Sequence, residues 1–157
     1  MNESTLIELR VLIQTLLGMP EHSVRPADSS QPTTGSEYAI VQVSDMEAQG
    51  WGGGSKDAYQ TGMATLTIDF MAKRASRNAH ALPLAMQTHY ATDTLIGLNV
   101  GFLGCSSARD LTSLEIERVS RYQIKMQLSY VAKYEQPPQI PDTGNIETVP
   151  IGMIAEP

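Results

Sequence analysis

The feature that most constrains the fold is a long period-two alternation at residues 119–134, near the end of the sequence. Apolar and polar residues take alternate positions there, and only Val131 breaks the polar side. This pattern predicts a β-strand with one buried and one solvated face. The residues expected on the buried face are Tyr122, Ile124, Met126, Leu128, Tyr130, Ala132 and Tyr134. A strand this much longer than the usual ~5–6 residues favours a sheet that spans an oligomer or lines a surface.

Length and charge restrict the class of protein. The chain has 157 residues, enough for one domain with its own core. A net charge of −6 argues against a general nucleic-acid binder, which needs a basic face, but not against a protein that DNA merely passes. The N-terminal residues do not resemble a signal peptide, and no stretch approaches the ~20 apolar residues of a membrane span. We therefore expect the protein to be located in a reducing cytoplasm, or in a particle assembled there.

The N-terminal half predicts a helix, a loop and a hairpin. Residues 4–17 carry apolar residues at helical spacing, with Ser4 or Thr5 as the expected cap and Gly18 at the end. Residues 21–37 are rich in Pro, Ser and Thr and predict an extended loop or arm. Strands at residues 38–46 and 59–73 flank a glycine-rich tip at residues 50–57, as in a long hairpin.

The second half predicts one more helix and an extended tail. Residues 77–94 have helical periodicity, and Pro83 places the expected start of the regular helix close to itself. Residues 95–105 predict a turn and a short strand, and residues 106–114 a polar connection. Three prolines follow Glu135, so residues 135–157 are expected to form an extended arm beyond a domain of residues 1–134. The apolar residues Ile146, Val149 and Ile151 suit an edge strand on the chain's own sheet or on a partner.

The residue types that carry catalysis or bind cofactors show no convincing spacing. His80 and His89 are nine residues apart, which does not place two metal ligands on one helical face. The glycine-rich tip lacks the spacing of a phosphate-binding loop. The single cysteine, Cys105, permits no internal disulfide and has no evident activating neighbour. We therefore expect no cofactor and no enzyme activity. Trp51, on the glycine-rich tip, is either a contact anchor or folds back on its own hairpin.

The order of these features resembles the neck or tail-terminator proteins of tailed bacteriophages, over residues 5–151. The most specific parts are Arg-Tyr-Gln-Ile at residues 121–124 and Ile-Glu-Thr-Val-Pro-Ile at residues 146–151. Two features have no match in the family: the glycine-rich tip around Trp51, and the proline at Pro83. The resemblance implies an α+β domain with a mostly antiparallel sheet, a long hairpin, two main helices, an extended loop and a C-terminal arm.

The resemblance also implies a function. Members of the family are virion structural proteins that form rings, usually of six copies. Such a ring ends the tail tube and contacts the tube, in some cases the sheath, and the head-side connector. DNA passes through it without specific binding, and the ring is assembled in the host cytoplasm.

Within this hypothesis, the candidate interface residues are Trp51, Arg121, Lys125, Ile146, Val149 and Ile151. The polar face of the strand at residues 119–134 is basic within an acidic protein, so it is either a contact to a neighbouring subunit or acidic partner, or a solvated face. Two other functions stay open: another tail or baseplate subunit with the same sheet, and a small α+β enzyme or ligand-binding domain. The second would need convergent polar residues at strand ends, which the sequence does not show.

Overall fold

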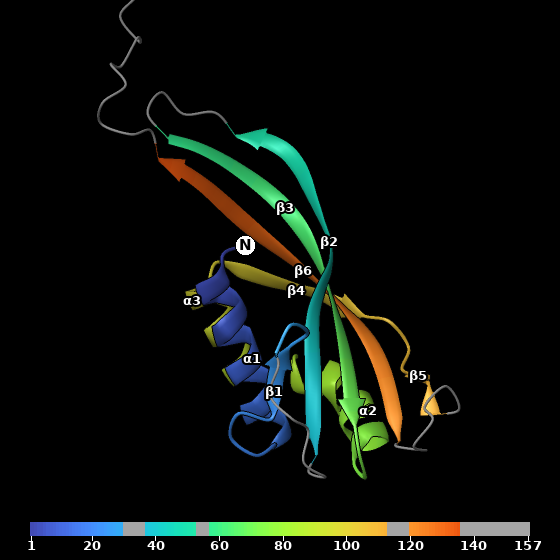
Figure 1. Ribbon diagram of the computed structural model, residues 1–157. Helices are drawn as coiled ribbons and strands as arrows, with labels where there is room; N and C mark the ends of the chain where they lie inside the picture. Colours follow the sequence, from blue (N-terminus) through green and yellow to red (C-terminus); the bar gives the residue numbers. More distant parts are fainter. Residues whose placement is uncertain (30–36, 53–56, 113–119, 136–157) are drawn as a thin grey trace, which may run out of the picture.

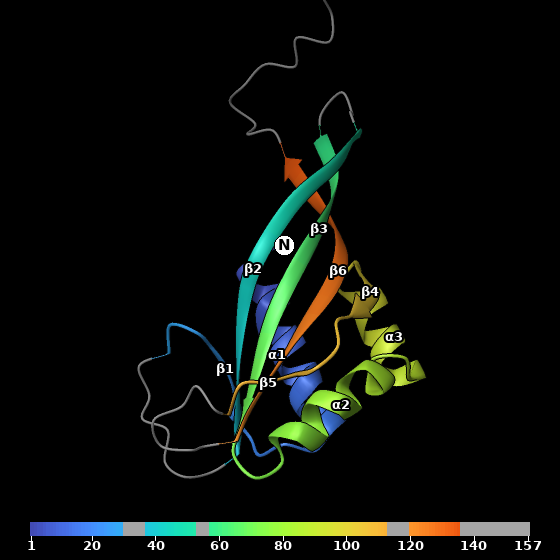
Figure 2. The ribbon, with the colours of Figure 1, turned by 90° about the vertical axis from the view of Figure 1, so that its right-hand side faces the viewer.

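The computed structural model shows an α+β fold in which three helices cover one face of a six-stranded, mostly antiparallel sheet (Figures 1 and 2). It describes residues 1–29, 37–52, 57–112 and 120–135. The order of the strands is β1-β2-β3-β6-β4, and β5 pairs with β6 next to β4. The predicted long hairpin and long last strand therefore form the centre of the sheet.

Helix α1 (Glu3–Leu17) begins at a cap one residue before its first turn. The Asn2 Oδ1 atom accepts hydrogen bonds from the backbone N–H and the hydroxyl of Thr5, at 2.8 and 2.7 Å. The expected caps, Ser4 and Thr5, are thus wrong: both lie inside the helix, and Asn2 supplies the acceptor that the first turn needs. The helix ends as predicted at Gly18, whose left-handed backbone (φ 59°) favours a residue without a Cβ atom.

Strand β2 (Tyr38–Gly52) and strand β3 (Asp57–Met71) form the predicted hairpin. Strand β2 continues six residues beyond the predicted end at Met46, through part of the glycine-rich tip, because β3 pairs with it as far as Gly52. The predicted loop before it contains a short strand, β1 (Val24–Pro26), which pairs in parallel with the start of β2. Cross-strand hydrogen bonding therefore extends regular structure beyond what local composition indicates.

The single helix expected around Pro83 is in fact two helices, α2 (Ala75–Ala85) and α3 (His89–Gly97). Helix α2 begins eight residues before Pro83, so the expected start of the helix was wrong. The missing N–H of Pro83 disturbs only the last turn of α2, because the helix ends two residues later. Thr88 then caps α3, with its hydroxyl accepting from the backbone N–H of Ala91 at 3.4 Å.

The last strands complete the sheet. Strand β4 (Val100–Cys105) and strand β5 (Arg109–Asp110) both pair with β6 (Arg121–Glu135), which also pairs with β3 along its whole length. The predicted two-faced strand is confirmed in its middle part: Ile124, Met126 and Leu128 are buried, whereas Lys125 and Gln127 are exposed. Ala132, expected on the buried face, is instead exposed, because β6 continues there beyond its pairing with β4. The arm was expected at residues 135–157; Glu135 is instead the last residue of β6, and residues 136–157 lie outside the described residues.

The hydrophobic core lies between the sheet and the three helices. Helix α1 contributes Leu9, Leu12 and Ile13, while Ile7 and Val11 remain about half exposed on its outer side. The sheet contributes alternate residues of β3 and β6, and the helices α2 and α3 close the layer. The largest buried side chains of the sheet are Leu66, Ile68, Phe70, Ile124, Met126 and Leu128. Because all three helices pack on this one face, the opposite face has no described helix over it.

Candidate interaction surface

Three strands extend beyond the helices and form a projecting blade, which we define as residues 47–52 of β2, 57–63 of β3 and 129–135 of β6 (Figures 1 and 2). Tyr59 and Val131 are 43% and 51% exposed there, on the side turned away from the helices. Ala58, Gln60 and Ala132, on the other side, are exposed as well. Both faces of the outer part of the blade are therefore accessible, which is unusual for a sheet that only supports a core.

The second surface is the open face, which we define as the side of the sheet turned away from the helices. The register places the odd-numbered residues of β3 and β6 on this side. The central column, on β3, is mostly uncharged and includes Met63, Thr65 and Thr67. The open face is thus a largely polar surface across three long strands.

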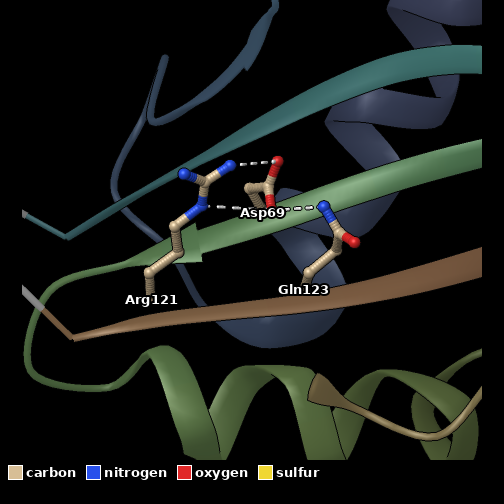
Figure 3. A network of polar contacts seen from close by, with 3 residues as sticks. All are labelled: Asp69, Arg121 and Gln123. Carbon is tan, nitrogen blue, oxygen red and sulfur yellow. Dashed lines mark hydrogen bonds and ion pairs between the residues drawn. The ribbon is translucent and has the colours of Figure 1, made fainter. Parts of the chain in front are cut away.

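A network of polar contacts joins β3 to β6 on the open face (Figure 3). Asp69 accepts two hydrogen bonds from the guanidinium of Arg121, each at 3.4 Å, and one from the side-chain amide of Gln123, at 3.1 Å. Asp69 and Arg121 are only 14% and 28% exposed. The candidate interface residue Arg121 therefore holds two central strands together within its own subunit.

Charges of opposite sign lie on opposite sides of the open face. On β2, the charged residues of this face are Asp45 and Glu47, both exposed and paired with Thr65 and Met63. On the other side, Lys125 of β6 and Arg109 of β5 are exposed. The sequence interpretation identified Lys125 but missed the two acids, because the irregularity between Val43 and Asp45 shifts the alternation of β2.

A hollow of about 380 Å³ lies beside the upper part of β6, where it is no longer paired with β4. The start of α1 and the turn between α3 and β4 form its walls, and residues 130–133 of β6 form the rest. A second hollow of about 260 Å³ involves the exposed side chains of Ile96 and Val131. This edge of β6 therefore offers backbone groups and apolar side chains to an extended segment.

The residues considered for chemistry have ordinary environments. The ring of His80 contacts the carbonyl oxygen of Ser76 at 2.7 Å, and His22 lies at the surface beside Glu21. Burial raises the pKa of the Cys105 thiol to about 11, which disfavours the reactive thiolate. Within the described ranges, no group of three His, Cys, Asp or Glu side chains is arranged to hold a metal ion.

The structure does not describe the side chains of the other predicted interface residues. Trp51 belongs to β2 at the end of the blade, but its side chain is not described. Ile146, Val149 and Ile151 lie outside the described residues. Of the described helices, none has both the length and the apolar character of a membrane span.

These surfaces define the class of protein: a small α+β subunit that presents an extended sheet and a projecting blade to its surroundings. The chain belongs to the phage neck terminator protein family, whose pattern it matches over residues 7–156. The family resemblance inferred from the sequence is thereby confirmed, and the chain is a structural protein of the phage neck. No curated protein matches the sequence.

Proposed function

We propose that copies of this chain form a ring, of six subunits, at the top of the phage tail. The ring ends the tail tube and joins it to the head-side connector. The observation that carries the proposal is the projecting blade, whose two exposed faces are available to neighbours. The chain's membership of the neck terminator family supports a role for the blade and the open face in contacts within the phage neck. Rings need two different patches on each subunit, and the end of the blade and the part of the open face outside the blade supply two such patches.

The ring also has to let DNA through. The net charge of −6 disfavours binding to phosphates, so a channel made by such subunits would let the nucleic acid slide. Tail tube and, in contractile tails, sheath proteins are the expected partners on one side of the ring. The connector is the expected partner on the other.

The mass of the purified chain in solution, together with negative-stain images, tests the ring. A particle six times the mass of the 17.1 kDa chain, seen as a ring or as a cap on tail tubes, is the expected result. A compact monomer that never adds to tail tubes would contradict the proposal. A reconstruction of the virion that places the chain at the baseplate would instead favour the alternative of a different tail subunit.

The candidate residues Ile146, Val149 and Ile151 enter this proposal as a docking segment. The unpaired edge of β6 beside the two hollows is a suitable acceptor for such a segment, from the same or a neighbouring copy. Deleting residues 146–157 should weaken assembly more than it lowers the thermal midpoint of the subunit. Deleting only residues 152–157 retains the three apolar residues and serves as the control. Equal losses of assembly and thermal stability would contradict the docking segment.

In this proposal, Trp51 contacts a partner protein at the end of the blade and anchors it there. Replacing it with Ala should leave the subunit folded but weaken attachment to the tail tube or connector, whereas Trp51→Phe should retain most of the attachment. Unchanged partner binding and infectivity in the Ala variant would contradict this role.

A further inference from the structure

We propose that the acidic side of the open face in one copy, Asp45 and Glu47, binds the basic side of the open face in the next copy, Lys125 and Arg109. This inference rests on the proposed assembly of the chain with itself and specifies which surfaces meet. The partner is thus a second copy of this chain.

The acidic side is accessible and rigidly placed. Asp45 and Glu47 pair with Thr65 and Met63 of β3, which puts both acids on the open face, and both are exposed. Two positions apart on one strand, they lie about 7 Å from each other. Strand β1 pairs only with residues 39–41 of β2. Along Asp45 and Glu47, β2 is therefore the outermost strand of the described sheet, and a neighbour can approach it from the side.

The basic side has a matching spacing. Lys125 of β6 pairs with Thr67, and Arg109 of β5 pairs with Gln123, two positions along β6. The two cations are therefore diagonal neighbours on one face, about 7–8 Å apart. Arg121 lies next to them but already holds Asp69. Two exposed cations on the one side thus have the spacing of the two exposed anions on the other.

The two sides do not neutralise each other within one subunit. Strand β3 separates them with its column of Met63, Thr65 and Thr67, so the acids and Lys125 are two strand spacings apart, about 10 Å or more. Among the described residues, none of the four charged side chains takes part in an ion pair. At physiological salt, charges at such a distance are largely screened from each other.

Copies that meet in this way use different patches, so the contact is heterologous and can repeat around a ring. Opposite charges also set the register, because like charges brought together across an interface are strongly unfavourable. The competing explanation is that Asp45 and Glu47 only protect an exposed strand edge from non-specific pairing. If that explanation holds, changing Lys125 and Arg109 should not affect assembly.

Two charge-reversal variants separate these explanations. The first, Asp45→Lys with Glu47→Lys, makes both sides of the open face basic. The second, Lys125→Glu with Arg109→Glu, makes both sides acidic. Each alone should need at least about 100-fold more protein to assemble than the wild type, because every contact then joins like charges. An equimolar mixture should assemble again, because the variants can alternate around a closed ring of even order.

Matched controls place the same charge changes on the helical layer. Glu8→Lys with Asp93→Lys, and Lys73→Glu with Arg77→Glu, alter exposed residues of the helices and of the turn before α2. Both should assemble like the wild type. If a reversed variant fails to fold, neutral variants repeat the test by removing the charges without inverting them. They are Asp45→Asn with Glu47→Gln, and Lys125→Gln with Arg109→Gln. Each should weaken assembly about tenfold and lose part of its salt dependence.

The outcomes distinguish this interface from the proposed function. Loss of assembly in each reversed variant, with recovery in the mixture, supports the pairing of the two sides. Wild-type assembly of both reversed variants alone, or no recovery on mixing, would overturn the pairing while leaving the ring intact. A wild-type chain that stays monomeric at all concentrations and never caps tail tubes would overturn the ring and this interface together.

Discussion

Gly62 of β3 lies directly opposite Tyr130 of β6, and the tyrosine ring occupies the space that a Cβ atom on Gly62 would need. An added Cβ would lie 2.6 Å from the Cζ atom of Tyr130. Gly62 is buried on the side of the sheet that faces the helices, where β4 also pairs with β6 at Tyr130. Any side chain at position 62 would therefore force the Tyr130 ring to move.

The variant Gly62→Ala should lower the free energy of unfolding by about 1–2 kcal/mol, because the tyrosine ring must move out of its packed position. Urea unfolding of the dilute monomer measures the change. In a Tyr130→Ala background, the same substitution should have little effect, since the ring is absent. Equal effects of Gly62→Ala in the two backgrounds would show that the glycine acts through the backbone alone.

Asp69 holds Arg121 and Gln123 on the open face, and its removal should destabilise the subunit. We expect Asp69→Ala to lower the free energy of unfolding by about 1–3 kcal/mol, because it leaves a largely covered guanidinium without its carboxylate. A chain of this length would then lose roughly 2–12 °C in thermal midpoint. The exposed residue Glu8, changed to Gln, is the control and should shift the midpoint little. A double-mutant cycle with Arg121→Gln should show coupling between the two sites.

The carboxyl group of Asp110 makes the stability of the folded protein depend on pH in the acidic range. Hydrogen bonds from Thr112, and also from the hydroxyl of Tyr122 at 2.8 Å, hold the pKa of this exposed carboxyl below its usual 3.8. Because the pKa is lower in the folded state, the stabilisation is present above about pH 3.8 and is lost as the pH falls through the folded-state pKa. An NMR titration should show the pKa rising toward 3.8 in Tyr122→Phe but not in the distant Tyr90→Phe. Identical titrations in both variants would contradict a role for the Tyr122 hydroxyl.

Cys105 should react slowly with thiol reagents in the folded protein. Burial raises its pKa to about 11, so very little thiolate exists at pH 8. A colorimetric disulfide reagent should modify it much faster in urea than in buffer. The same shift favours the folded state below pH 9, and this contribution is lost as the pH rises through about 11. Rapid reaction in buffer at pH 8 would contradict the raised pKa of this half-buried thiol.

Much of the fold follows from local sequence patterns. The alternation of β6, the helical stripe of α1 with Gly18 at its end, and the hairpin of β2 and β3 are each encoded by neighbouring residues. Two of the errors occur where a distant partner decides. Strand β1 exists because it pairs with β2, and β2 extends into a glycine-rich stretch because β3 pairs with it. Local composition does not contain these long-range hydrogen bonds.

For the candidate surface too, some features follow from the local sequence and others only from the tertiary structure. The sequence by itself determined that β6 has a basic face, because side chains alternate along a strand whatever its neighbours are. Only the tertiary structure decided that Arg121 holds Asp69, that Lys125 lies near Arg109, and that two acids of β2 share their face. Those relationships depend on register and on a strand irregularity at Ser44, which arise when strands far apart in the chain pair.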